Sequence, residues 1–247
     1  MRMTRYIAVF CAIAVYAAAH APARAFSSEV DTGSREENAL FKKPDASFRS
    51  DRIGKRYVAQ TIIEEWSGAK LPPPPVLKPA RVDAGKTALL LFDFTTQTCT
   101  QERRPRCAAS VPKLKRLLDD ARARNMFVVY SIATADSKPS DILPEIAPRA
   151  SDPVLPPLGP DKFIGSDFEK MLKDKGVDTI IITGTAAQTT VLHTGGEAAL
   201  RGFKVVVPVD GMSSNDVFSE LYTAWHLSTA ARIAPVLILT KVDMITY

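Results

Sequence analysis

The chain has 247 residues, of which 46% are hydrophobic and 24% charged, and its formal net charge is +5. This length suits one α/β domain with an extension and allows a sizeable core. The basic balance does not indicate a nucleic-acid-binding protein, because such proteins gather Lys and Arg on a motif or stripe. The one dense cluster, Arg103-Arg104-Pro105-Arg106, falls in an expected loop and is interpreted as solvated surface, with an anionic partner as the alternative.

The first 25 residues have the order of a secretory signal peptide. A basic start precedes an uninterrupted apolar or small run from Tyr6 to Ala19, and Ala23-Arg24-Ala25 is a small-x-small cleavage signal. The run is short for a membrane span, which needs about 20 residues, so an uncleaved anchor is the less favoured alternative. Cleavage would remove three arginines and no acid, which lowers the net charge from +5 to +2. The signal-peptide pattern therefore predicts a soluble periplasmic or secreted protein without membrane attachment.

Residues 26–85 are expected to form an irregular N-terminal arm. Residues 26–51 are polar and lack a clear period, whereas 57–66 have the spacing of a short amphipathic helix. Four prolines then favour an extended polyproline segment at 71–75. The arm either wraps the domain or a neighbouring subunit, or is a disordered tether.

Residues 86–247 show apolar strands alternating with helices. Strands are expected at 87–93, 126–131, 179–184, 203–208 and 236–240, and helices at 111–125, 166–175, 189–200 and 215–231. This order predicts a three-layer α/β/α fold around a doubly wound, mainly parallel sheet. Without a glycine-rich dinucleotide turn or a P-loop, no nucleotide cofactor is expected.

Cysteine usage agrees with export. Cys11 leaves with the signal peptide, so that Cys99 and Cys107 remain close together in an oxidising compartment. A disulfide between them is the favoured interpretation. The alternative is a reactive thiol at Cys99, just past a strand end.

Ligands of parallel α/β sheets bind beyond the carboxyl ends of the strands. Asp93 ends the first strand, segment 184–190 joins the third clear strand to a helix, and segment 160–165 leads into another helix. Asp93 is therefore expected to face the ligand crevice. The alternative is a carboxylate that caps a helix or pairs with a surface cation.

Three sequence blocks carry a family resemblance: segment 88–93 (ALLLFD), Lys162 with the FIGSDFEKML segment after it, and segment 176–194 (GVDTIIITGTAAQTTVLHT). They resemble the isochorismatase-like family of cysteine hydrolases, in which the first block is the strand ALLxIDxQ and the last is the strand and nucleophile turn. The resemblance covers about residues 86 to 240 and implies the family fold. It also implies a base role for Asp93, support of substrate charge by Lys162, and an oxyanion hole from the turn at Ala186 and Ala187.

The chain departs from the family at important positions. Thr190 stands where the family has its nucleophilic cysteine, and Lys162 is displaced by a few residues from the family lysine. Thr95 replaces the family glutamine, with Gln97 two residues later as a candidate substrate-binding residue. The family's turn often contains a cis peptide, which raises that question for the Ala186–Ala187 bond.

A threonine hydroxyl is a far poorer nucleophile than a thiolate and needs a strong adjacent base. His193 lies three residues later on the same helical face, so a Thr190/His193 dyad is one alternative. The favoured role of Thr190 is ligand binding or helix capping, with His193 as a packing or substrate-binding residue.

The leading hypothesis is an exported hydrolase that acts on a small polar molecule by Asp93-assisted activation of water. The family's cysteine-free branch, which hydrates the vinyl ether of isochorismate, is the precedent. One alternative is a binding protein that has lost the reaction, and another is an acyl-enzyme amidase using Thr190. No metal is expected, because His193 and His226 lack the spacing of the family's zinc site. The resemblance also implies a homo-oligomer.

Overall fold

The computed structural model describes residues 61–247. The predicted signal peptide, the polar leader and the start of the predicted helix at 57–66 lie outside these residues. The chain divides into two compact units, one ending at Gly68 and one beginning at Ala69. The described end of the predicted helix is not α-helical: it forms a turn and a 3-10 helix, Trp66–Gly68, with exposed side chains throughout 61–68. A short helix gains little from propensity unless it buries an apolar face.

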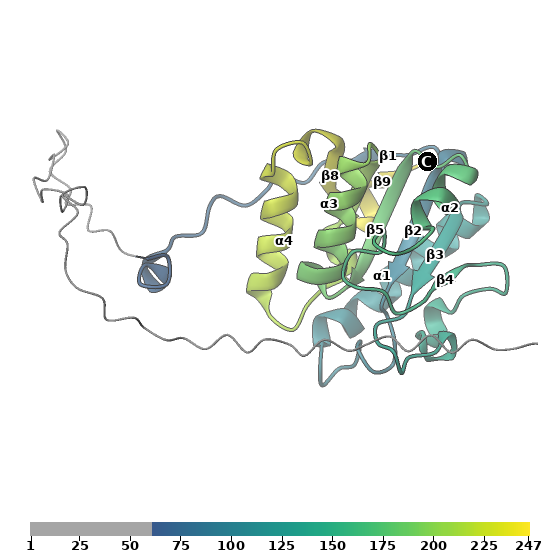
Figure 1. Cartoon of the computed structure of the whole chain (residues 1–247), viewed down its shortest axis with the longest axis horizontal. Coiled ribbons are helices and arrows are strands. Elements are labelled where there is room, and N and C mark those ends of the chain that lie inside the picture. Colours follow the sequence, from purple (N-terminus) through teal and green to yellow (C-terminus); the bar gives the residue numbers. More distant parts are fainter. Residues whose placement is uncertain (1–60) are drawn as a thin grey trace, which may run out of the picture. The chain divides into compact units, whose positions relative to one another are not determined.

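A parallel sheet forms the centre of residues 69–247 (Figure 1). Its strand order is β4-β3-β2-β5-β6-β8. Strand β7 pairs with the last two residues of β5, past the residues of β5 that pair with β6. The strands are β2 (Thr87–Phe92), β3 (Phe127–Ser131), β4 (Val154–Leu155), β5 (Thr179–Thr185), β6 (Lys204–Pro208), β7 (Met212–Ser213) and β8 (Leu237–Thr240). All of their pairings are parallel, which confirms the predicted sheet type.

The order of the strands creates a switch point between β2 and β5. From β2 the chain builds outward through β3 to β4, and from β5 it builds in the opposite direction through β6 to β8. Parallel sheets open a crevice at such a point, beyond the carboxyl ends of the two central strands. In this chain those ends are followed by Asp93 and by the segment after Thr185.

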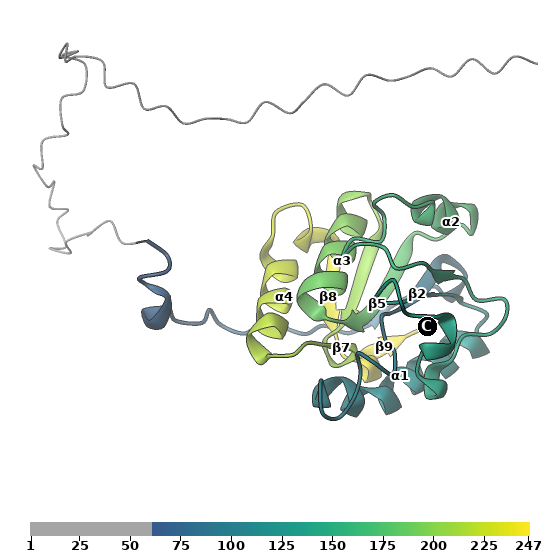
Figure 2. The ribbon, with the colours of Figure 1, turned by 60° about the horizontal axis from the view of Figure 1, so that its bottom comes forward.

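Helices cover both faces of the sheet (Figure 2). Because successive strand residues point to opposite faces, Leu89 and Leu91 pack with the leucines of α1 (Pro105–Ala123). Leu90 and Phe92 belong to the other core, with residues of α2 (Phe168–Asp174), α3 (Leu192–Leu200) and α4 (Val217–Thr229). The three-layer prediction is therefore confirmed.

Two boundaries differ from the predictions by more than three residues. Helix α1 begins at Pro105, six residues before the expected start, because proline at the first helical position needs no backbone N–H partner. The compact unit also begins before residue 86: β1 (Ala80–Arg81) pairs with β9 (Ile245–Thr246), and the Lys78 N–H donates to the Leu239 carbonyl at 2.9 Å. The end of the predicted arm is thus part of the domain. Within residues 61–247 no helix has both the length and the apolarity to cross a membrane.

Candidate active site

Asp93 lies directly after β2 with a backbone φ of 63°. This left-handed conformation is uncommon for residues other than glycine, although aspartate tolerates it better than most. Neighbouring groups hold it in place. The Asp93 N–H donates to the Ser131 carbonyl at 3.1 Å, and its own carbonyl accepts from the Thr98 hydroxyl at 2.6 Å. The backbone therefore turns sharply at the strand end, where it aims the carboxylate at the crevice.

Three side chains surround the Asp93 carboxylate. The Lys162 ammonium donates to both oxygens at 3.3 Å. The Ser131 hydroxyl donates to Oδ1 at 2.7 Å, and the Thr190 hydroxyl donates to Oδ2 at 2.5 Å. The structure thus brings together the three residues that the sequence identified as catalytic candidates, although they are far apart in the chain.

The supporting elements fix these partners. Lys162 lies in the loop before α2, where its N–H donates to the Thr194 hydroxyl of α3 at 3.1 Å. Thr190 lies in a π-helical turn, Ala187–Val191, that leads from β5 into α3. Such turns occur frequently at functional sites. Despite its displacement in the sequence pattern, the lysine contacts the Asp93 carboxylate.

The Asp93–Lys162 ion pair is shielded from water, since only 7% and 2% of the two side chains are exposed. Removing both charges from water has a high desolvation cost, which their attraction offsets only when further hydrogen bonds complete the site. Ser131 and Thr190 supply such bonds. A carboxylate held in this way is suited to proton transfer in a low-dielectric site.

The predicted oxyanion turn is buried at Ala186 and Ala187. A cis peptide bond joins Thr185 to Ala186, one bond before the position that the family resemblance suggested. The N–H groups of Thr189 and Thr190 both donate to the Ala186 carbonyl, at 3.2 and 3.1 Å. The Thr190 N–H is therefore engaged within the turn.

Two predicted site residues lie outside the cluster. His193 is exposed, and the Thr190 hydroxyl donates to Asp93, so the structure gives no support to a Thr190/His193 dyad. Gln97 is also exposed, and its backbone carbonyl accepts a hydrogen bond from the Arg103 guanidinium. The helical spacing of His193 indicates a shared face only approximately, because the turn containing Thr190 is π-helical and differs from an α-helix in period.

Arg104 is a further residue of the site, which its sequence context did not predict. It was interpreted as part of a solvated cluster, yet its side chain is buried at the N-terminus of α1. Its Nη1 donates to the Thr185 hydroxyl at 2.9 Å and its Nε to the Asn215 amide oxygen at 2.6 Å. Burial lowers the pKa of Arg104, Arg103 acts in the same direction, and the charge of Asp93 opposes both. No local sequence signal separates this arginine from its exposed neighbours.

The predicted disulfide is present. Cys99 and Cys107 are bonded, with 5.3 Å between their Cα atoms. The bridge closes the loop that contains Arg104 and ties it to the first turn of α1. The alternative of a reactive Cys99 thiol is therefore wrong in this structure.

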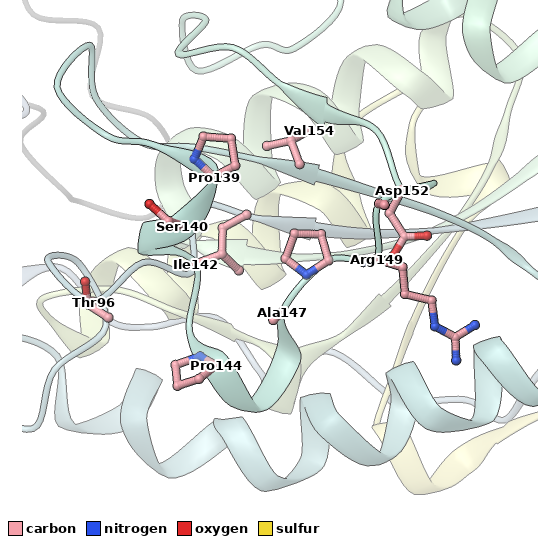
Figure 3. Close-up of a pocket in the computed structure, with 11 residues that line it drawn as sticks. Thr96, Pro139, Ser140, Ile142, Pro144, Ala147, Arg149, Asp152 and Val154 are labelled. Atoms are coloured by element: carbon pink, nitrogen blue, oxygen red, sulfur yellow. Dashed lines mark hydrogen bonds between the residues drawn. The ribbon is translucent and has the colours of Figure 1, made fainter.

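A surface groove of about 740 Å³ lies along the irregular segment before β4 (Figure 3). Its walls come mostly from proline, alanine and aliphatic side chains, together with Thr96 and Ser140, and Arg149 and Asp152 lie at one end. None of Asp93, Lys162 or Thr190 lines it. We therefore place the candidate active site at the buried cluster, where the reactive groups converge.

Relatives with described functions share the domain. A model of the isochorismatase domain matches residues 87–237. A secreted isochorismatase effector of Verticillium dahliae is 26% identical over 118 residues, which cover 44% of this chain and 62% of the relative. The N-carbamoylsarcosine amidase of an Arthrobacter species is 29% identical over 124 residues, which cover 40% of this chain and 47% of the relative. The chain thus matches only about half to two thirds of the length of these relatives.

Solved structures share the fold. An isochorismatase-like hydrolase from Alkaliphilus metalliredigens aligns with a TM-score of 0.57 at 23% identity, over 64% of this chain and 95% of that one. The N-carbamoylsarcosine amidase from Thermoplasma acidophilum aligns with a TM-score of 0.54 at 21% identity, over 64% of this chain and 97% of that one. The domain match over most of the chain confirms the family that the motifs indicated. The chain belongs to the isochorismatase family of hydrolases.

Proposed function

We propose that this protein hydrolyses a small polar molecule by activating water with Asp93. The observation that carries the proposal is the buried carboxylate at the switch point, contacted by Lys162 and Thr190. A water molecule beside Thr190 would donate to its hydroxyl oxygen while that hydroxyl donates to Asp93. Proton transfer along this relay leaves a hydroxide-like oxygen to attack the substrate, and Asp93 returns the proton to the leaving group.

Lys162 has a supporting role in this proposal. Its ammonium contacts both carboxylate oxygens, so it stabilises the charge that Asp93 carries before it accepts the proton and regains when it returns the proton to the leaving group. In a site with little water, such fixed charges act more strongly than they would in solution. The amidase among the relatives suggests amides and carbamoyl compounds as the first substrates to try.

One observation favours a second candidate, in which Thr190 attacks the substrate directly. Its hydroxyl already lies 2.5 Å from Asp93 Oδ2, the position of a nucleophile beside its base. A hydroxyl is a much weaker nucleophile than the family's thiol, so we rank this mechanism below water activation. Intact-mass spectra of protein mixed with substrate would reveal the covalent acyl-threonine that only this mechanism forms.

The proposal is tested with Asp93→Asn, Thr190→Val and Thr190→Cys, screened by mass spectrometry against small amides, carbamoyl compounds and isochorismate. We expect wild-type turnover that falls by at least about 100-fold in Asp93→Asn, the usual size of a general-base contribution, and that also falls in Thr190→Val. Turnover that survives in Asp93→Asn would contradict the proposal. An inactive wild type together with an active Thr190→Cys would instead identify a binding protein that has lost its reaction.

We also propose export with cleavage after Ala25. The signal-like N-terminus, the disulfide and the secreted relative support this proposal. N-terminal sequencing of the protein recovered outside the cytoplasm is expected to begin at Phe26. An N-terminus at Met1 in that fraction would contradict cleavage.

A further inference from the structure

Arg104 is a buried cation that has no carboxylate partner among the residues that the structure describes. It is only 8% exposed, and its two hydrogen bonds go to neutral side chains, those of Thr185 and Asn215. Among residues 61–247, none of the ion pairs includes it, although its exposed neighbour Arg106 pairs with Glu220. Buried charges in proteins are usually paired, because an unpaired one loses its hydration without compensation.

Arg104 also lies beside the reactive centre. Phe92 and Gly184 are register partners on β2 and β5. Asp93, directly after β2, and Thr185, the last residue of β5, therefore follow these partners at the same edge of the sheet. Adjacent strands are about 5 Å apart, and Arg104 Nη1 bonds directly to the Thr185 hydroxyl. The charge of Asp93 is accordingly among the groups that act on Arg104.

The disulfide loop holds the arginine in this place. Cys99 and Cys107 flank it in sequence and are bonded to each other. The bonds to Thr185 and Asn215 fix two of the three guanidinium nitrogens, which orients the plane of the group. A guanidinium held in this way suits a planar carboxylate better than a flexible ammonium would.

We propose that Arg104 binds a carboxylate of the substrate, so that the protein acts on small molecules that carry this group next to their hydrolysable bond. The identification of the bound molecule as a substrate rests on the proposed function, whereas carboxylate binding by Arg104 does not require turnover. The substrate's anion supplies the partner that the buried arginine lacks. Asp93 remains available for proton transfer because Lys162, Ser131 and Thr190 hold its carboxylate.

The test is a binding experiment on the full mature protein with matched probes: acetate, benzoate and N-carbamoylglycine, each beside its uncharged primary amide. Affinity is measured by calorimetry or ligand-observed NMR for the wild type, Arg104→Met, Arg104→Lys and the control Arg103→Met. Arg103 is the exposed neighbour, so its replacement removes the same formal charge. We expect at least one wild-type carboxylate to bind about tenfold or more tightly than its amide, as for a hydrogen bond to a charged group.

This preference should disappear in Arg104→Met, fall in Arg104→Lys and persist in Arg103→Met. A wild type that prefers none of the carboxylates, or an Arg104→Met protein that keeps the preference, would overturn the inference. A purely structural arginine would alter stability without changing the carboxylate-to-amide ratio. If Arg104→Met does not fold, the wild-type ratio and Arg104→Lys still decide the question.

The outcome is separable from that of the proposed function. Carboxylate binding through Arg104 without any turnover would contradict the proposed hydrolysis and support the role of Arg104. Asp93-dependent hydrolysis at equal rates for charged and uncharged probes would support hydrolysis and contradict the role of Arg104.

Discussion

Asp93 and Lys162 form an ion pair from which water is nearly excluded. Each partner is buried, so the charge of one makes the burial of the other tolerable. Ser131 and Thr190 add hydrogen bonds to the carboxylate but carry no charge that could replace the ammonium. The stability of the fold is therefore coupled to the group on which the proposed chemistry depends.

Replacing Lys162 by Met should lower the free energy of unfolding by about 3–5 kcal/mol, because it leaves a buried carboxylate unpaired. Adding Asp93→Asn should recover part of this loss, since the remaining group is then neutral. Denaturant unfolding of the single and double variants measures both effects. Lys170→Met is the control, because Lys170 pairs with Asp174 on the surface, where an ion pair contributes little to stability. Equal losses at Lys162 and Lys170 would refute the coupling.

At the scale of elements, the disulfide braces the start of α1. On the chain-entropy estimate, a bridge that closes so short a loop stabilises the folded protein by about 2–3 kcal/mol. The Cys99→Ala/Cys107→Ala double variant should unfold at correspondingly lower denaturant concentration. Reductant should lower the midpoint of the wild type and leave that of the double variant unchanged. A reductant effect of equal size on both proteins would exclude the bridge as its cause.

The turn between β6 and β7 depends on a glycine. A Cβ added at Gly211 would lie 2.9 Å from Thr183 Cγ2 and 3.2 Å from Pro208 Cγ, closer than packed side chains allow. Gly211→Ala should therefore destabilise the protein by about 1–3 kcal/mol, the usual cost of overpacking. Gly159→Ala is the matched control, because nothing lies within 4 Å of its added Cβ. The melting temperatures of both variants provide the comparison. Equal melting temperatures would contradict the prediction.

The central strands were predictable because burial on both faces makes them continuous apolar runs. Residues 87–92 and 179–185 are buried throughout, which is the pattern that identified them. The role of Asp93 as a site candidate was predictable from its place at the end of such a run. The two-residue strands β1, β4, β7 and β9 were missed, because they are too short to display a period.

Arg104 shows the limit of local sequence reasoning. Its partners Thr185 and Asn215 lie 81 and 111 residues further along the chain, so nothing near Arg104 distinguishes it from the exposed Arg103. His193 shows the opposite error, since its spacing from Thr190 suggested a contact that the π-helical turn does not provide. Both errors concern side-chain direction, which depends on tertiary contacts more than on residue type.

For the domain as a whole, the segment before residue 86 joins the two ends of the fold. Strand β1 pairs with β9, the Val82 N–H donates to the Thr246 carbonyl at 2.9 Å, and Ala80 and Val82 are buried in the core on the α1 face. Leu77 packs against the opposite core. This segment thus closes the C-terminal end of the domain.

Two truncations test that role. A chain that begins at Ala69 keeps every contact of the compact unit and should melt within about 2 °C of the mature protein. A chain that begins at Ala84 loses β1 and the burial of Val82, worth about 1.5–3 kcal/mol. At about 2–4 °C per kcal/mol for a domain of this size, its melting temperature should fall by about 3–12 °C. Equal melting temperatures for both truncations would show that β1 contributes nothing to stability. An equally large fall in the chain from Ala69 would mean that the residues before it also stabilise the domain.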